Sequence, residues 1–254
     1  MTPPAPDAPI VGLLLAAGAG TRMGRPKALV ADPETGEPWL RRAVRTLQSG
    51  GCAQLVVVLG AEAQRAAALL GPQPQPSTPA APWPAEPGGT TAAPASAAPG
   101  SGPTTLADQS DDAAGPAGHV HVVVAEDWAT GQAASLRAGI RAAQGLGAAA
   151  VVVTLVDLPS LDPRAVARLL GAAAPTDPDT APRPESAGPA TLRQAAYDGR
   201  PGHPVVIGAA HFDALLAGLS GDTGARPYLR AHGVELVDCT DLGGGDDVDT
   251  LRAG

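Results

Sequence analysis

Short apolar runs alternate along this sequence with longer stretches in which apolar side chains recur at helical spacing. Four apolar runs have the length and continuity of strands that are buried on both faces. They cover residues 9–15, 55–59, 120–125 and 150–156. The helical spacing occurs between them, at residues 40–47, 61–70 and 135–140. Because strand and helix alternate, the pattern predicts an α/β domain with a largely parallel central sheet.

Two segments interrupt this pattern. Residues 71–118 are dominated by Pro, Ala, Gly, Ser and Thr, and Leu106 is their one aliphatic residue larger than alanine. Such a segment buries too little apolar surface to offset the entropy lost on ordering. We therefore expect a disordered insertion at residues 71–118 and a shorter one at residues 172–200. Since no internal repeat is visible, the remainder of residues 8–254 is assigned to a single domain.

Composition and charge exclude several classes of function. The chain has 254 residues, a formal net charge of −8 and only 2% aromatic side chains, which disfavours binding to nucleic acid. No run reaches the roughly 20 apolar residues that span a bilayer, and the N-terminus lacks the basic start of a signal peptide. Cys52 and Cys239 are too few for a disulfide framework or a four-cysteine zinc site, and are predicted to be buried thiols. We expect a cytoplasmic protein that acts on small molecules, without a nucleic-acid or membrane partner.

The densest chemical signal follows the first predicted strand, in the segment Leu15-Ala16-Ala17-Gly18-Ala19-Gly20-Thr21-Arg22-Met23-Gly24-Arg25-Pro26-Lys27. Glycines after a buried strand let the backbone approach a ligand closely, and successive N–H groups can hold phosphate oxygens. Arg22 and Lys27 add positive charge. Lys27 is the only lysine in a chain with 16 arginines, which indicates a position where a compact ammonium differs from a guanidinium. The segment therefore predicts a phosphate site.

The spacing of the glycines separates this loop from two other phosphate-binding loops. Gly24 is followed by Arg25 rather than by Lys-Ser or Lys-Thr, so the segment is not a Walker A loop. Its glycines follow the pattern GxGxxxG, one residue longer than the dinucleotide-binding fingerprint, and Pro26 interrupts the position where that motif starts its helix. A glycine-rich turn without a ligand is the structural alternative.

Carboxylates near the ends of predicted strands are candidates for a metal site. Asp157 follows the fourth apolar run, at the carboxyl edge where open α/β sheets bind ligands. A carboxylate there suits Mg²⁺, which takes few protein ligands and completes its shell with phosphate oxygens and water. The alternative for Asp157 is a turn or helix cap. Asp247 and Asp249 would share one face of an extended segment, but their glycine-rich surroundings are also typical of a solvated turn.

The glycine-rich loop resembles the signature LAAGxGxRMGxxK of the nucleotidyltransferase superfamily, in particular of the MobA-like molybdenum cofactor cytidylyltransferases. Further segments resemble elements of that family in the same order along the chain. They are Gly131 to Gly139, the DxP element Asp157-Leu158-Pro159, the GHP element Gly202-His203-Pro204, the GDxGAR element Gly221 to Arg226, and the DxDT element Asp247 to Thr250. The resemblance implies a three-layer, Rossmann-like nucleotidyltransferase fold over most of the chain.

The resemblance also implies roles for individual residues. Arg22, Lys27 and Asp157 would be catalytic, and Mg²⁺ would be bound by Asp157 and Asp249. The nucleotide would be bound by Leu15, Ala16, Ala17, Gly18, Gly20, Thr21, Arg22, Lys27, Gly131 and Ser135. The acceptor would be bound by Gly202, His203, Asp222 and Arg226. For His203 and Arg226, a structural histidine and a salt bridge are the respective alternatives.

The reaction that the resemblance implies is the transfer of CMP from CTP to the phosphate of molybdopterin or its molybdenum form, with release of pyrophosphate. CTP is favoured over GTP because related guanylyltransferases begin the loop with Leu-Ala-Gly-Gly, whereas this chain has Leu15-Ala16-Ala17-Gly18. A molybdenum hydroxylase would receive the product. Guanylyl or other nucleotidyl transfer to a sugar phosphate or phospholactate is one alternative, and a non-catalytic carrier of the cofactor is another.

Overall fold

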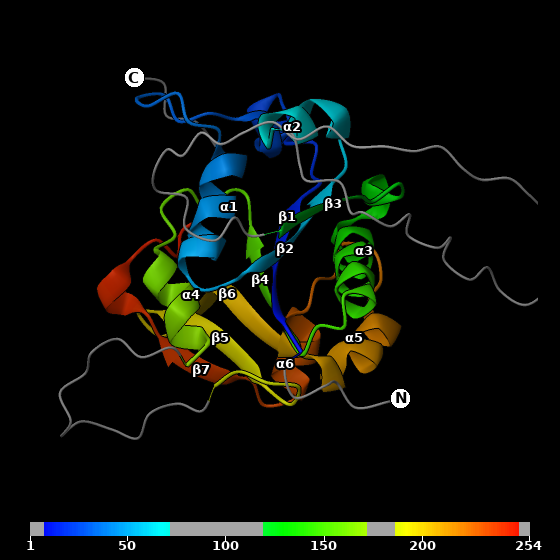
Figure 1. The fold of residues 1–254 in the computed structure, drawn as a ribbon, viewed down its shortest axis with the longest axis vertical. Helices are drawn as coiled ribbons and strands as arrows, with labels where there is room; N and C mark the ends of the chain where they lie inside the picture. Colours follow the sequence, from blue (N-terminus) through cyan, green and yellow to red (C-terminus); the bar gives the residue numbers. More distant parts are fainter. Residues whose placement is uncertain (1–7, 72–118, 172–185, 249–254) are drawn as a thin grey trace, which may run out of the picture. The chain divides into compact units, whose positions relative to one another are not determined.

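The computed structural model describes residues 8–71, 119–171 and 186–248, all within one compact unit (Figure 1). The first expected insertion, residues 71–118, lies outside the described residues except for Gly71, and so do residues 172–185 of the second. No helix in the described ranges is long and apolar enough to cross a membrane.

The described strands form one sheet of 7 strands in the order β3-β2-β1-β4-β6-β5-β7. Their bounds are β1 Ile10–Ala16, β2 Gln54–Leu59, β3 His119–Val124, β4 Ala150–Leu155, β5 Leu192–Tyr197, β6 Arg200–Gly208 and β7 Glu235–Asp238. All neighbouring pairs are parallel except those of β6, which runs antiparallel to β4 and β5. The four apolar runs of the sequence are β1 to β4, so the prediction of a largely parallel sheet is confirmed.

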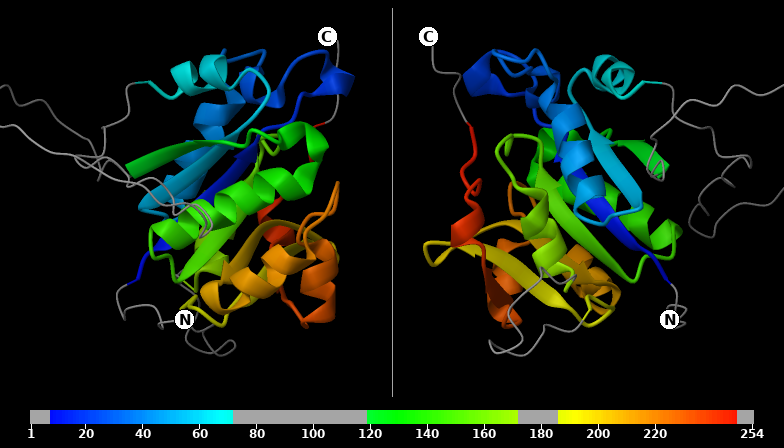
Figure 2. Two further views of the ribbon diagram at one scale, coloured as in Figure 1. Left: turned by 90° about the vertical axis from the view of Figure 1, so that its right-hand side faces the viewer. Right: turned by 60° about the vertical axis from the view of Figure 1, so that its left-hand side comes forward.

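Helices cover both faces of the sheet, which gives three layers (Figures 1 and 2). One core cluster packs the sheet against α1 Trp39–Ser49, α2 Ala63–Leu69 and α4 Pro163–Leu169. The other packs it against α3 Gln132–Gly145, α5 Phe212–Gly218 and α6 Arg226–Ala231. In β1, Leu14 faces the first cluster while Leu13 and Leu15 face the second, because side chains alternate along a strand. Burial on both faces explains the apolar runs of β1, β2 and β4, whereas β3 is an edge strand whose side chains are half-buried or exposed, so the expectation of burial on both faces is wrong for it.

The expected second insertion is wrong in its C-terminal part, because residues 192–197 form β5. Its sequence, Leu-Arg-Gln-Ala-Ala-Tyr, hides a strand because two polar residues are buried in it. Arg193 Nε is 2.9 Å from Glu235 Oε2 on β7, and Gln194 Nε2 donates to Gly202 O on β6 at 3.0 Å. These partners, which are distant in sequence, satisfy polar groups that would otherwise oppose burial.

Candidate functional site

The only lysine of the chain contacts the predicted metal ligand. Lys27 begins a short 3-10 helix after the glycine-rich loop, and its Nζ is 2.6 Å from Asp157 Oδ2. Their side chains are only 18% and 14% exposed. The pair forms because β1 and β4 are parallel neighbours, so the loops that follow their carboxyl ends meet at one edge of the sheet. The structure therefore joins two residues that are 130 positions apart in sequence.

The second carboxylate oxygen of Asp157 is buried and has no hydrogen-bond partner among the described residues. A buried carboxylate oxygen without a partner is unfavourable, since it has lost its hydration. A cation at this position would satisfy it, so Asp157 fits a divalent metal. In the part of the chain that the structure describes, no group of three or more His, Cys, Asp or Glu residues gathers around one point. A metal bound to Asp157 would therefore take its other ligands from substrate, water or residues outside that part, among them Asp249.

The C-terminal segment passes directly over the turn that carries Asp157. Val248 N donates to Asp157 O at 2.9 Å. Gly244 has a φ of 79°, and a Cβ at this position would collide with the carbonyl oxygen of Ser160. Only glycine therefore allows so close an approach with this backbone conformation. The segment brings Asp247 to the wall of a cavity next to the Asp157 turn.

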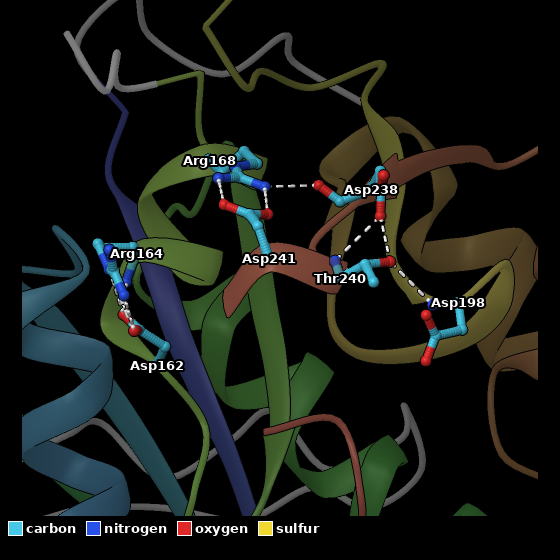
Figure 3. A network of polar contacts seen from close by, with 7 residues as sticks. All are labelled: Asp162, Arg164, Arg168, Asp198, Asp238, Thr240 and Asp241. Atoms are coloured by element: carbon cyan, nitrogen blue, oxygen red, sulfur yellow. Dashed lines mark hydrogen bonds and ion pairs between the residues drawn. The ribbon is translucent and has the colours of Figure 1, made fainter. Parts of the chain in front are cut away.

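A network of ion pairs attaches the start of this segment to α4 (Figure 3). Arg168 Nη1 and Nη2 lie 2.6 Å and 2.8 Å from the two carboxylate oxygens of Asp241, and Nη1 also donates to Asp238 O at 2.7 Å. The hydrogen bonds from Arg168 hold the pKa of Asp241 below its usual value. Thr240 Oγ1 donates to Asp238 Oδ1 at 2.6 Å and accepts from Asp198 N at 2.8 Å. The turn after β7 is therefore fixed to both α4 and the β5–β6 turn, which the interpretation as a solvated turn did not anticipate.

We expect Arg168→Ala to loosen this attachment and to raise the Mg²⁺ concentration needed for half-maximal activity about fivefold. The free energy of unfolding should change little, because the carboxylate of the pair is exposed to solvent. Arg164→Ala is the matched control, since Arg164 also lies on α4 but pairs with Asp162 in its own turn (Figure 3). Equal Mg²⁺ requirements in the two variants, measured by titrating activity, would contradict this role of Arg168.

A cavity of about 520 Å³ brings the predicted acceptor residues together. Gly202, His203, Asp222 and Arg226 all line it, and Leu155 and Leu158 on either side of Asp157 belong to the same wall. Its volume is in the range of pockets for small molecules. The sequence motifs did not single out two further lining residues, Gln132 and Gln194. Gln132 directly follows Gly131, which the sequence motifs include. Gln194 had no sequence signal, because it lies in β5, within the range that the composition assigns to an insertion.

His203 is held as a neutral imidazole in this wall. Its Nδ1 lies 3.3 Å from Val153 O, and because a carbonyl can only accept, Nδ1 carries the proton. Burial lowers the pKa of His203 below its usual value. Tyr197 Oη donates to His203 O at 2.9 Å and fixes the backbone beside it. Nε2 is therefore the acceptor nitrogen of the ring, so His203 can receive a hydrogen bond from a ligand but offers no positive charge.

The predicted nucleotide-binding loop divides into a buried and an exposed part. Leu15 and Ala16 end β1 and Ala17 follows it; these residues are 8%, 2% and 4% exposed, so they could contact a ligand mainly through the backbone. Gly20 has a φ of 60°, and a Cβ there would collide with the carbonyl oxygen of Arg25. This close approach turns the chain back toward Lys27 through Thr21–Met23, with Thr21 and Arg22 exposed. The loop is thus a shaped backbone turn at the end of β1.

The other two predicted nucleotide-binding residues lie at the start of α3. Gly131 is the N-cap of this helix, and a Cβ there would collide with the backbone of Gly221. Ala133 N donates to Gly221 O at 3.0 Å, so the loop that carries Asp222 is attached to this helix start. Ser135 lies one turn further and is only 7% exposed. The expected nucleotide and acceptor elements therefore meet at the N-terminus of α3.

Gly18 provides a test of the loop that does not disturb the fold. A Cβ added at Gly18 would meet no atom within 4 Å, and its φ lies outside the left-handed region. We expect Gly18→Ala to change the free energy of unfolding by less than about 0.5 kcal/mol, but to raise the KM for the nucleotide at least tenfold if phosphates approach this backbone. Gly218→Ala on α5 is the control, because its added Cβ also meets open space. An unchanged KM for Gly18→Ala would argue against a phosphate at Gly18.

Comparisons with known proteins identify the family of this chain. Residues 12–236 match the family described as MobA-like NTP transferase domain. Nicotine blue oxidoreductase of Paenarthrobacter nicotinovorans is 34% identical over 246 residues, which cover 96% of this chain and 93% of that protein. The chain therefore belongs to the MobA-like NTP transferase domain family, a family of nucleotidyltransferase enzymes, which confirms the family and enzyme class that the motifs predicted.

Solved structures support the fold. A nucleotidyl transferase of Methanothermobacter thermautotroptrophicus superposes with a TM-score of 0.61 at 18% identity, covering 96% of this chain and 93% of that one. Rv0371C of Mycobacterium tuberculosis H37Rv, solved in complex with manganese, superposes with a TM-score of 0.52 at 21% identity, covering 91% and 86%. The predicted three-layer, Rossmann-like nucleotidyltransferase fold is thereby confirmed.

Proposed function

We propose that this enzyme transfers CMP from CTP to the phosphate of molybdopterin or its molybdenum form and releases pyrophosphate, in a reaction that depends on Mg²⁺. The observation that carries the proposal is the state of Asp157. One of its oxygens is paired with Lys27, while the other is buried and has no partner among the described residues. A carboxylate in this state, beside a cavity and at the carboxyl edge of the sheet, is suited to a divalent metal and a triphosphate.

The loop after β1 and Asp157 would bind the phosphates and the metal, respectively. Backbone N–H groups around Gly18 and Gly20 would hold the phosphates, with Arg22 and Lys27 opposing the negative charge that develops on the leaving pyrophosphate. Asp157 would hold Mg²⁺, with Asp249 as the predicted second ligand. When bound, Mg²⁺ supplies neutralisation of phosphate charge and a fixed orientation of the phosphates. Catalysis would then consist mainly of positioning and charge stabilisation.

The acceptor would lie in the cavity that His203 and Arg226 line. Its attacking group is a phosphate monoester, which is already ionised at neutral pH and needs no general base. A neutral His203 suits this arrangement, because it orients a ligand through a hydrogen bond rather than through charge. Arg226 is exposed and has no partner among the described residues, so its charge is available to the acceptor's phosphate.

The choice of CTP rests on the Leu15-Ala16-Ala17-Gly18 start of the loop. Ala17 is buried, and its carbonyl accepts from Ala61 N at 3.0 Å, so this position belongs to the strand end rather than to a flexible turn. Mg²⁺ is the proposed metal, and the manganese complex of the M. tuberculosis protein supports a divalent cation in a protein of this fold. A molybdenum hydroxylase in the cytoplasm is the proposed recipient of the product.

One assay tests the reaction. The purified protein is incubated with each of the four nucleoside triphosphates, Mg²⁺ and molybdopterin, and pyrophosphate release is followed. We expect release with CTP and much less with GTP. Sugar phosphates and phospholactate are tested in parallel. Pyrophosphate release with one of these alone would identify it, rather than molybdopterin, as the acceptor. Cofactor binding without any pyrophosphate release would favour a carrier.

A redox reaction is the second candidate, because the relative with 34% identity is named an oxidoreductase. Burial raises the pKa of Cys52 to about 12, and Cys239 is buried as well, so neither thiol is suited to redox chemistry. Electrons would have to come from an external donor such as a reduced nicotinamide dinucleotide. We therefore add this donor and nicotine blue, the compound in the name of that relative, to the protein and follow donor absorbance. Oxidation of the donor without any pyrophosphate release from CTP would replace the transferase proposal.

A further inference from the structure

A second cavity of about 310 Å³ adjoins the one that brings the acceptor residues together. The two cavities share four lining residues, which are Gln194, Pro201, Arg226 and Leu229. The residues that line the second cavity belong to α6, to the turn that follows it and to β5, β6 and β7, the last three strands at one edge of the sheet. A ligand that fills the first cavity can therefore extend past Arg226 into the second.

The second cavity combines an apolar floor with two cations. Leu229, Val234 and Leu236 supply the apolar part, and Leu236 is 49% exposed, one of the two large hydrophobic residues of the described chain that are exposed. Arg226 and Arg230 are one helical turn apart on α6, so their guanidinium groups lie on the same face of this helix. A floor of this kind with charged groups beside it suits an amphipathic ligand.

The two guanidinium groups have no hydrogen-bond or ion-pair partner among the described residues, although the chain carries a net charge of −8. Glu235, which lies between the floor residues Val234 and Leu236 in sequence, is paired with Arg193 instead. Its Oε2 is 2.9 Å from Arg193 Nε. Elsewhere in the described chain, Arg42, Arg45, Arg164 and Arg168 all have carboxylate partners. Arg226 and Arg230 therefore form no ion pair within the described residues, although Asp222 and Asp247 also line the first cavity.

We propose that the second cavity binds a second anionic group of the acceptor, carried at the far end of a flat ring system whose phosphate lies in the first cavity. This inference rests on the proposed function, since it describes the far end of the same acceptor. Arg230 would be the residue that recognises the second anion, while Arg226, which lines both cavities, lies between the two ends. A guanidinium suits this role because it stacks on flat rings and also binds anions through paired N–H groups.

The binding step is tested without the acceptor, using 8-anilinonaphthalene-1-sulfonate as a flat, apolar anion. Its fluorescence is titrated with the full chain, with Arg230→Ala and with Arg141→Ala, an exposed arginine on α3 outside both cavities. We expect about tenfold weaker binding for Arg230→Ala and no change for Arg141→Ala. Arg230→Lys keeps the charge and should recover part of the affinity. Equal affinity of all variants overturns the proposal.

Measurements of turnover distinguish failure of this proposal from failure of the proposed function. With the acceptor that supports turnover, Arg230→Ala should raise the KM for the acceptor about tenfold and leave the KM for the nucleotide unchanged. A parallel rise in both KM values overturns the second site. If the unaltered protein binds the sulfonate through Arg230 but releases no pyrophosphate with any acceptor, the anion site stands and the proposed transfer fails.

Discussion

Asp157→Asn should lower the turnover number by about 1,000-fold, because it removes the negative charge that would hold the metal on the phosphates. Asparagine keeps the shape of the side chain and can still accept a hydrogen bond from Lys27 Nζ, which now lies 2.6 Å from Oδ2. The loss of the ion pair leaves a largely shielded ammonium, so the free energy of unfolding should fall by about 1 to 3 kcal/mol. Turnover and denaturant unfolding are measured on the same preparation.

The control for this variant is Asp127→Asn. Asp127 is an exposed aspartate that follows the end of β3, so it lies after a strand of the same sheet but makes no contact with Lys27. Its replacement should leave activity and Mg²⁺ dependence unchanged. If Asp157→Asn keeps most of its activity with the original Mg²⁺ dependence, then Asp157 is only the structural partner of Lys27, and the metal assignment is wrong.

The first half of the fold could be predicted because its strands are buried on both faces. Burial on both sides leaves few polar positions in β1, β2 and β4, so each appears in the sequence as a continuous apolar run. The glycine-rich loop was visible for a related reason, since a turn that carries Gly20 at positive φ against the backbone of Arg25 leaves no room for a side chain.

The second half was harder to predict because its stability comes from partners distant in sequence. Arg193 is buried in β5, where Glu235 Oε2 and Leu169 O accept hydrogen bonds from its guanidinium. Asp241 begins an acidic, glycine-rich stretch of the sequence, and in the structure Arg168 on α4 attaches it to the rest of the fold. Sequence patterns report local periodicity, and none of these contacts leaves a local signal.

The sequence motifs named residues for the candidate site, but they did not predict how these residues contact one another. The motifs named Lys27 and Asp157 separately, with the lysine assigned to the leaving pyrophosphate and the carboxylate to the metal. The structure shows the two side chains bonded to each other. This contact depends on the parallel pairing of β1 with β4, which the chain order alone does not specify. Lys27 would therefore also orient Asp157, in addition to opposing phosphate charge.

This dual role can be tested by comparing Lys27→Arg with a control variant in the same loop, and by combining Lys27→Arg with Asp157→Asn. Arg25→Lys is the control, because Arg25 is exposed two residues before Lys27, and its exchange should leave kcat/KM unchanged. In a background of Asp157→Asn, Lys27→Arg should have little further effect, since both changes act on one unit. Additive losses in the double variant would show that Lys27 acts independently of Asp157, on the phosphates alone.

Lys27→Arg should lower kcat/KM by about 10- to 100-fold, a loss of roughly 1 to 3 kcal/mol in transition-state stabilisation, although the charge is kept. The ammonium of Lys27 contacts Oδ2 of Asp157 and leaves Oδ1 without a hydrogen-bond partner among the described residues. A guanidinium prefers to bind both carboxylate oxygens at once, so the side chain introduced by this substitution would cover the oxygen that is proposed for the metal. The variant should consequently need a several-fold higher Mg²⁺ concentration, which a titration of activity against Mg²⁺ measures. Unchanged kcat/KM at all Mg²⁺ concentrations would show that Lys27 contributes only its positive charge and that its geometry has no role.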